Sequence, residues 1–180
     1  MKELILGGVR SGKSRLAENK ARAGGLVVTC VVTAQSHDAE LAERIREHRK
    51  QRPAHWKVVE EPLSLAATLK TLAAPDRCLL VDCLTIWLSN LLHADQDLAM
   101  MSPESIIMRE RQALLETIPT LTGHIIFVSN EVGMGIVPLG ELSRRFCDEI
   151  GRLHQDLAGL CDRVTLMVAG LPLVVKGNTA

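Results

Sequence analysis

The stretch that decides the fold is Gly7-Gly8-Val9-Arg10-Ser11-Gly12-Lys13-Ser14, near the start of the 180-residue chain. It fits the phosphate-loop pattern G-x-x-x-x-G-K-[ST] at every position, with the apolar run Leu4-Ile5-Leu6 before it and a helical pattern after it. Glycines allow a tight turn to direct several backbone N–H groups at one anion, and the N-terminus of the following helix adds partial positive charge. The stretch therefore predicts a phosphate-binding turn. The plainer alternative is a glycine-rich turn that only caps a helix.

Two side chains of this loop and one beyond it predict nucleotide and metal chemistry. Lys13 is expected to contact the β- and γ-phosphates of a nucleotide, and the Ser14 hydroxyl to coordinate Mg²⁺. Asp82 ends an apolar run, the position of the second metal ligand in such proteins, although it could instead cap the next helix. The sequence contains no N-K-x-D guanine-reading motif, which argues against a switch-type GTPase.

Outward from this loop, apolar strand-like runs alternate with helical patterns. We expect strands at residues 3–6, 26–33, 56–59, 78–82, 125–130, 163–169 and 173–176, and helices near residues 13–23, 38–49, 63–72, 85–93, 103–117 and 140–160. This alternation predicts an α/β fold with a mostly parallel sheet covered on both faces and a short antiparallel strand at the C-terminus. Residues 93–102 are the most loop-like segment and are too short to divide domains, so residues 1–180 are expected to form one domain.

Composition excludes several classes of protein. The chain is 47% hydrophobic and 23% charged, and its 21 Lys and Arg balance its 21 Asp and Glu. Balanced charge, with two Trp, two Phe and no Tyr, argues against a nucleic-acid partner. The five cysteines form no C-x-x-C pair, as expected of a reduced cytoplasmic protein. The longest apolar run is too short for a membrane helix, and the N-terminus reaches Arg10 too soon for a signal peptide, so we expect no membrane partner.

A histidine between two arginines is a candidate nucleophile. Arg44, His48 and Arg52 are spaced by four, which places them on one stripe of the predicted helix if that helix continues to Arg52. Flanking cations disfavour the imidazolium form, so the ring would stay neutral and nucleophilic near pH 7. The alternative is an ordinary solvated charged face, and spacing alone does not decide between the two.

Two further segments lie at predicted strand ends. Glu60-Glu61-Pro62 could bind ribose hydroxyls or cap the next helix. Ser129-Asn130-Glu131-Val132-Gly133 leaves a buried strand and enters a glycine-rich loop, where it could handle substrate or form a plain turn.

In this order, the motifs resemble those of the bifunctional adenosylcobinamide kinase/adenosylcobinamide-phosphate guanylyltransferase family of cobalamin synthesis. The resemblance spans nearly the whole chain, and the ordered set is far more specific than the phosphate loop alone. Its segments are residues 7–15, Arg44-Ile45-(x2)-His48-Arg49-(x2)-Arg52-Pro53-(x2)-Trp56, Glu60-Glu61-Pro62, residues 129–138, Gly151-Arg152-Leu153-(x)-Gln155-(x)-Leu157-Ala158 and Gly170-Leu171-Pro172.

The resemblance implies a RecA-like P-loop fold, a homotrimer and two reactions. A nucleoside triphosphate, ATP or GTP, phosphorylates the aminopropanol hydroxyl of adenosylcobinamide, and GMP is then transferred from GTP through a GMP–histidine intermediate with release of pyrophosphate. By motif position, that histidine is His48, with Lys13 as the second catalytic residue and Mg²⁺ held by Ser14 and Asp82. The implied nucleotide-binding residues are Gly7, Gly8, Val9, Arg10, Ser11, Gly12, Lys13, Ser14, Val31, Val32, Thr33, Arg49, Lys50, Gln51, Arg52, Glu60 and Asp82.

Three positions depart from the family pattern as it is found in some members. Some carry two histidines where this chain has Glu47-His48, many have asparagine at the position of His154, and some have glutamate at that of Asp82. The general base of the kinase step stays open between Asp82 and Glu131. The alternative functions are a P-loop kinase of another small molecule, with a structural His48, and a non-catalytic nucleotide-dependent partner-binding module.

Overall fold

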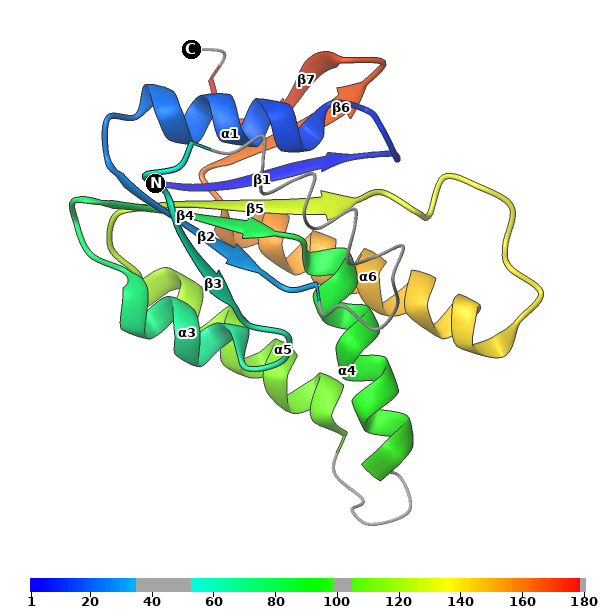
Figure 1. The fold of residues 1–180 in the computed structure, drawn as a ribbon. Helices are drawn as coiled ribbons and strands as arrows, with labels where there is room; N and C mark the ends of the chain where they lie inside the picture. Colours follow the sequence, from blue (N-terminus) through cyan, green and yellow to red (C-terminus); the bar gives the residue numbers. More distant parts are fainter. Residues whose placement is uncertain (35–52, 99–104, 179–180) are drawn as a thin grey trace.

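A seven-stranded sheet forms the centre of the computed structural model, which describes residues 1–34, 53–98 and 105–178 (Figure 1). The strand order is β3-β2-β4-β5-β1-β6-β7. The strands are β1 (Lys2–Gly7), β2 (Val27–Val32), β3 (Lys57–Glu60), β4 (Arg77–Asp82), β5 (His124–Asn130), β6 (Arg163–Val168) and β7 (Leu171–Lys176). The helices are α1 (Lys13–Ala23), α3 (Leu65–Leu72), α4 (Leu84–Leu98), α5 (Ile106–Thr117), the short 3-10 helix η1 (Ile118–Thr120) and α6 (Glu141–Leu160).

Helices cover both faces of the sheet, as the alternation of apolar runs predicted. Helix α1 lies on one face and α3, α4, α5 and α6 lie on the other (Figure 1). Under α1, Ala17 and Ala21 pack on alternate strand residues such as Ile5 and Ile126. The side chains of the intervening strand residues point to the other face, where residues such as Leu4 pack against the larger layer of helices. The central strands β1, β2, β4 and β5 therefore bury both of their faces, which explains why they read as continuous apolar runs, whereas the edge strands β3 and β7 are largely exposed.

The predicted parallel sheet with an antiparallel C-terminal strand is confirmed. β1 to β6 pair in parallel, and β7 runs antiparallel to β6. β7 begins at Leu171, two residues earlier than predicted, because Ala169 and Gly170 form a two-residue turn with φ of 51° and 85°. Positive φ at both central positions is the geometry of a tight hairpin. The predicted helix at residues 38–49 lies outside the described residues.

Helix α4 corrects one expectation. Residues 93–102 were expected to form a loop, but α4 continues to Leu98. Asp95 explains the longer helix, because its carboxylate accepts hydrogen bonds from the Ile106 backbone N–H (2.8 Å) and the Arg145 guanidinium (2.7 Å). One side chain near the end of α4 thus joins the start of α5 to α6. No helix within the described ranges has the length and apolar character to cross a membrane.

Candidate nucleotide-binding site

Residues 7–14 form a closed turn between β1 and α1. The Ser11 N–H donates to the Gly8 carbonyl at 3.2 Å, and the Leu16 N–H donates to the Gly12 carbonyl at 3.0 Å as the helix begins. The Lys13 ammonium folds back and donates to the Gly8 carbonyl at 3.2 Å. The chain therefore turns back on itself here and places the Lys13 amine over the loop.

Two of the loop's glycines are needed by this geometry. Gly12 has a φ of +95°, a conformation that other residues rarely adopt. A Cβ at Gly7 would lie 2.5 Å from Ser11 Oγ and 2.9 Å from Met167 Cβ. The turn between β6 and β7 supports the loop from outside, since the Gly170 N–H donates to the Ser11 carbonyl at 3.0 Å.

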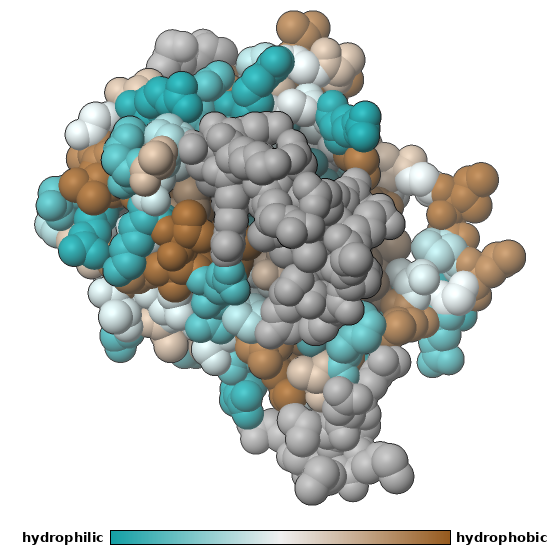
Figure 2. Space-filling model, viewed as in Figure 1, coloured by the Kyte–Doolittle hydropathy of each residue, from teal (hydrophilic) through white to brown (hydrophobic). Residues whose placement is uncertain are grey.

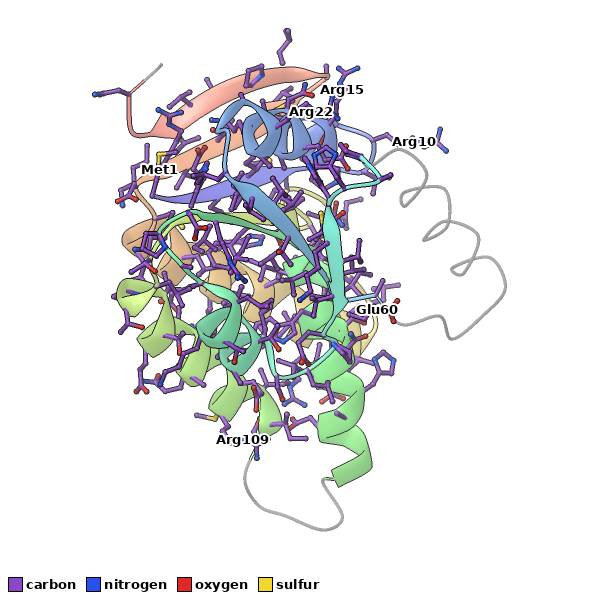
Figure 3. All side chains as sticks on the ribbon, turned by 60° about the vertical axis from the view of Figure 1, so that its left-hand side comes forward. Met1, Arg10, Arg15, Arg22, Glu60 and Arg109 are labelled. Atoms are coloured by element: carbon purple, nitrogen blue, oxygen red, sulfur yellow. The ribbon has the colours of Figure 1, made fainter. Side chains whose placement is uncertain are left out.

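The start of α1 is suited to an anion. Gly12 at the N-cap offers no side-chain acceptor, and the first turn contains no acidic residue. The first N–H groups of a helix have no partner within the helix, and the helix dipole adds positive charge there. A phosphate could accept their hydrogen bonds. Arg10, by contrast, is exposed and points away from the sheet (Figure 3).

Asp82 lies at the end of β4, near Lys13. Burial lowers the pKa of Lys13, while the negative charge of Asp82 acts in the opposite direction. The described residues contain no group of three or more His, Cys, Asp or Glu side chains that could hold a metal ion. The oxygen donors predicted here are the Ser14 hydroxyl and the Asp82 carboxylate. Such a set fits Mg²⁺, which is usually held by one or two protein oxygens together with phosphates and water.

The residues predicted from the end of β2 have buried side chains. Val31 and Val32 pack into the cores on opposite faces of the sheet. Thr33 is fully buried, and its hydroxyl donates to the Cys83 carbonyl at 2.7 Å and accepts from the Cys83 N–H at 3.0 Å. Asn90 donates to the Thr33 carbonyl at 2.8 Å. These contacts hold the ends of β2 and β4 together beside the phosphate loop. A nucleotide contact at Val31, Val32 or Thr33 remains a prediction.

The structure separates the two glutamates that follow β3. Glu61 accepts hydrogen bonds from the N–H groups of Leu63 (3.0 Å) and Ser64 (2.7 Å) and from the Thr68 hydroxyl (2.9 Å). It therefore caps α3, one of the two roles that the sequence left open. Glu60 is exposed on the same side of the molecule as Arg10 (Figure 3). Its contact with ribose remains a prediction.

A buried polar network follows β5. Ser129 Oγ lies 2.8 Å from His154 Nε2 and 3.2 Å from Thr85 Oγ1, which accepts from the Asn130 N–H at 2.7 Å. His154 Nδ1 lies 3.7 Å from Glu131 Oε2. Burial lowers the pKa of His154, although the Glu131 carboxylate opposes this shift. The network connects α4, β5 and α6 and ends at Glu131.

Glu131 lines a cavity of about 410 Å³ beside the phosphate loop. Its walls combine loop residues with largely apolar residues around the end of β6. The lining residues are Gly8, Val9, Arg10, Ser11, Glu131, Met134, Leu166, Met167, Val168 and Ala169. A second substrate could therefore lie next to a nucleotide bound at the loop.

Part of the predicted site lies outside the described residues. This part contains the candidate nucleophile His48, the adjacent Arg49, Lys50, Gln51 and Arg52, and Arg44. The predicted site residues that the structure does describe lie along one edge of the sheet. Strands β1 to β5 are parallel, so their carboxyl ends meet at this edge. At or just after these ends lie the phosphate loop, Thr33, Glu60, Asp82 and Glu131.

Sequence reasoning missed the supporting polar residues of α4. Thr85 and Asn90 are the positions in question, and both bind strand ends at the site edge. The available signal was the presence of polar side chains in the otherwise apolar run Leu84-Thr85-Ile86-Trp87-Leu88 and just after it. A polar residue in a buried helix needs a partner, and strand ends supply unpaired backbone groups.

Comparison with known proteins gives matches over almost the entire chain. Residues 3–175 match the family model described as cobinamide kinase / cobinamide phosphate guanyltransferase. The bifunctional adenosylcobalamin biosynthesis protein CobP of Pseudomonas aeruginosa is 58% identical over 178 residues, covering 99% of each chain. The corresponding CobU proteins of Salmonella typhimurium and Escherichia coli K12 are 40% and 37% identical, each over 96% of this chain and 98% of its own.

Solved structures share the fold at low sequence identity. The type III secretion ATPase EscN of enteropathogenic E. coli aligns with a TM-score of 0.56 at 15% identity, over 93% of this chain and 42% of that one. A prototypical ATPase of a bacterial type III secretion system aligns with a TM-score of 0.57 at 16% identity, over 93% of this chain and 52% of that one. This chain thus spans about half the length of those ATPases. The likeness shows a RecA-like P-loop fold.

Proposed function

Because this chain belongs to the cobinamide kinase / cobinamide phosphate guanyltransferase family, we propose that it phosphorylates adenosylcobinamide and then transfers GMP from GTP to the new phosphate. The end-to-end match to a relative named as bifunctional in adenosylcobalamin biosynthesis, at 58% identity, carries this proposal. The closed phosphate loop with Lys13 folded over it supports the part that concerns nucleotides. The products would be adenosylcobinamide-GDP and pyrophosphate.

The loop geometry supports the kinase step. The γ-phosphate of ATP or GTP would accept hydrogen bonds from backbone N–H groups within residues 8–14. The Lys13 ammonium would move from the Gly8 carbonyl to the β- and γ-phosphate oxygens. Positioning and charge neutralisation supply most of the catalysis in phosphoryl transfer. Ser14 and Asp82 would hold Mg²⁺, which, when bound, neutralises charge on the phosphates.

The second step needs a nucleophile, for which we propose His48. A ring nitrogen of neutral His48 would attack the α-phosphorus of GTP as the bond from that phosphorus to its bridging oxygen breaks and pyrophosphate leaves. A phosphate oxygen of adenosylcobinamide phosphate would then attack the same phosphorus, and the P–N bond would break. Arg49, Lys50, Gln51 and Arg52 would surround the GTP in this step.

The remaining contacts to GTP are assigned by motif position. Val31, Val32 and Thr33, whose side chains are buried, would lie against it at the end of β2. Glu60, exposed at the end of β3, would accept hydrogen bonds from the ribose hydroxyls. We further propose that residues 1–180 form one domain and that the enzyme is a cytoplasmic homotrimer.

Retention of label tests the nucleophile. Protein incubated with α-³²P-GTP and then denatured should retain acid-labile, alkali-stable radioactivity, as expected of a phosphoramidate. His48→Asn should abolish the label and leave phosphorylation of adenosylcobinamide measurable, because the kinase step does not use the imidazole. His93→Asn, a substitution of an exposed histidine on α4, should retain the label. Persistent label on the His48→Asn protein would exclude His48 as the nucleophile.

Turnover of adenosylcobinamide distinguishes this proposal from the two alternatives. The proposed enzyme converts adenosylcobinamide to a nucleotide-linked product. A kinase of another small molecule would leave it unchanged while phosphorylating a different acceptor, and a partner-binding module would turn over no acceptor. Chromatography of the corrinoid after incubation with magnesium, ATP and GTP separates these outcomes.

A further inference from the structure

The network that ends at Glu131 defines the position of a proton as well as of a side chain. The Asn130 N–H must donate to Thr85 Oγ1, because a backbone N–H group can only donate a hydrogen bond. A neutral His154 has one N–H and one lone pair, and a lone pair on Nδ1 would be repelled by the Glu131 carboxylate 3.7 Å away. His154 therefore carries its proton on Nδ1, facing Glu131. Nε2 then accepts from the Ser129 hydroxyl at 2.8 Å, which accepts from Thr85 Oγ1 at 3.2 Å.

One oxygen of the Glu131 carboxylate is hydrogen-bonded, and the other lies near His154. Oε1 accepts from the Gly133 N–H at 2.6 Å, and Oε2 faces the His154 N–H. The Glu131 N–H donates to the Gly7 carbonyl at 3.1 Å, so the residue is attached directly to the phosphate loop. Its side chain is 21% exposed and lines the cavity that the loop also lines. It is thus an oriented and accessible carboxylate next to the predicted phosphate position.

Asp82 has a different place in the site. Its charge acts on the Lys13 ammonium, and the proposed function assigns it to Mg²⁺. Glu131 instead faces His154, which burial keeps neutral. The two carboxylates therefore have different environments and suit different roles.

We propose that the acceptor hydroxyl binds in the cavity between Glu131 and the phosphate loop, that Glu131 takes its proton during phosphoryl transfer, and that His154 is the positioning residue for this base. This inference rests on the proposed kinase step. The hydroxyl oxygen forms a bond to the γ-phosphorus as the bond from that phosphorus to the β–γ bridging oxygen breaks. The nucleoside diphosphate leaves with the electron pair, and the hydroxyl proton goes to a Glu131 oxygen. The cavity has an apolar wall for the uncharged aminopropanol arm of adenosylcobinamide, formed by Leu166, Met167 and Val168.

Glu131→Gln in the full-length protein tests the base, with the two reactions assayed separately. The kinase kcat should fall about 100-fold or more, the usual contribution of a positioned base. The KM for nucleotide, the label retained from α-³²P-GTP and the melting temperature should stay close to the wild-type values. Transfer of GMP to adenosylcobinamide phosphate made beforehand should also continue, because that acceptor has no hydroxyl proton to lose. Glu141→Gln, a carboxylate at the start of α6, is the matched control and should leave both reactions unchanged.

Chemical rescue and two substitutions of His154 extend the test. Added formate should restore part of the kinase activity of Glu131→Ala by supplying a carboxylate. His154→Asn, which keeps an N–H donor, should retain a higher kinase kcat than His154→Phe at similar KM for the acceptor. A purely structural histidine would change stability without this split between kcat and KM.

Two results would overturn the inference while leaving the proposed function standing. One is a Glu131→Gln kinase kcat within about threefold of that of the wild type, well under the contribution of a general base. The other is an equal loss of both reactions in a folded Glu131→Gln protein, which would place Glu131 in the shared nucleotide site. A wild-type protein that binds nucleotide but does not phosphorylate adenosylcobinamide would instead refute the proposed kinase step, and this inference with it.

Discussion

Glu3 is a buried carboxylate in the first strand, at the opposite end of β1 from the phosphate loop. Its side chain is 1% exposed, and it contacts Lys20 Nζ at 2.8 Å and His124 Nε2 at 3.0 Å. Burial alone would raise the pKa of Glu3, but the hydrogen bonds from His124 and Lys20 outweigh it and lower the pKa from 4.5 to about 2. The folded state therefore binds this proton more weakly than the unfolded state does.

Glu3→Gln should make the protein less stable in a pH-dependent way. A lowered pKa means that the ionised carboxylate stabilises the fold above pH 4.5 and that this contribution is lost as the pH falls toward 2. At pH 7 the free energy of unfolding should fall by about 2–3 kcal/mol, since Lys20 loses a buried partner. Urea unfolding at pH 7 and pH 3 measures the difference, which should shrink at the lower pH.

Glu116→Gln is the control for this residue, because Glu116 is exposed near the end of α5. It should change the free energy of unfolding by less than about 0.5 kcal/mol at either pH. An equal loss at pH 7 and pH 3 in Glu3→Gln would mean that packing, and not the charge of Glu3, stabilises this position.

At the scale of elements, Asp95 joins three helices. Besides the bonds to Ile106 and Arg145, its carboxylate accepts from the Ser105 hydroxyl at 3.3 Å. Burial would raise the pKa of Asp95, but these hydrogen bonds and the charge of Arg145 lower it. The carboxylate thus stays ionised at the N-terminus of α5, where negative charge is favourable.

Asp95→Ala should lower the free energy of unfolding by about 1–2 kcal/mol, the usual cost of losing a helix cap together with an ion pair. Activity at saturating substrate should be retained, because Asp95 lies on the helical layer away from the phosphate loop. Arg109→Ala is the matched control near the start of α5, since its contact with Glu110 is on an exposed side chain. Circular dichroism during urea titration compares the two proteins. A similar stability for both would show that the Asp95 contacts contribute nothing.

At the scale of the whole molecule, the segment after β5 exposes apolar side chains. This segment extends from the body of the molecule in Figure 1, and hydrophobic residues stand out along the same edge of Figure 2. Ile136 and Leu139 are each 98% exposed, and Met134 and Val137 are also exposed. The exposure of several neighbouring apolar side chains to water is unfavourable, and such patches are typical of contact surfaces.

The homotrimer implied by the family resemblance predicts the mass of the particle in solution. Sedimentation equilibrium should give three times the 19.7 kDa mass of the chain. Ile136→Ser with Leu139→Ser should shift the distribution toward smaller species if this segment contributes to the contact between subunits. A wild-type protein that sediments as a monomer at micromolar concentration would contradict the trimer.

The sequence by itself determined the sheet and the phosphate loop. Both depend on local chemistry: continuous apolar runs bury two faces of a parallel strand, and Gly7 and Gly12 allow a turn that other residues would block. The order of motifs also predicted the family, which the comparisons confirmed. The antiparallel C-terminal strand was also predicted, although from Gly170-Leu171-Pro172 as the turn, whereas the turn lies at residues 169–170.

Only the tertiary structure decided how distant polar groups pair. Glu61 capping α3, Asp95 extending α4, and Ser129, His154 and Glu131 meeting beside the loop all depend on contacts between separate elements. Ser129 and His154 are 25 residues apart, and neither has a local pattern that selects its partner. A buried polar group takes whichever partner the packed elements bring within hydrogen-bond distance, so its role follows from the assembled fold and not from its neighbours in sequence.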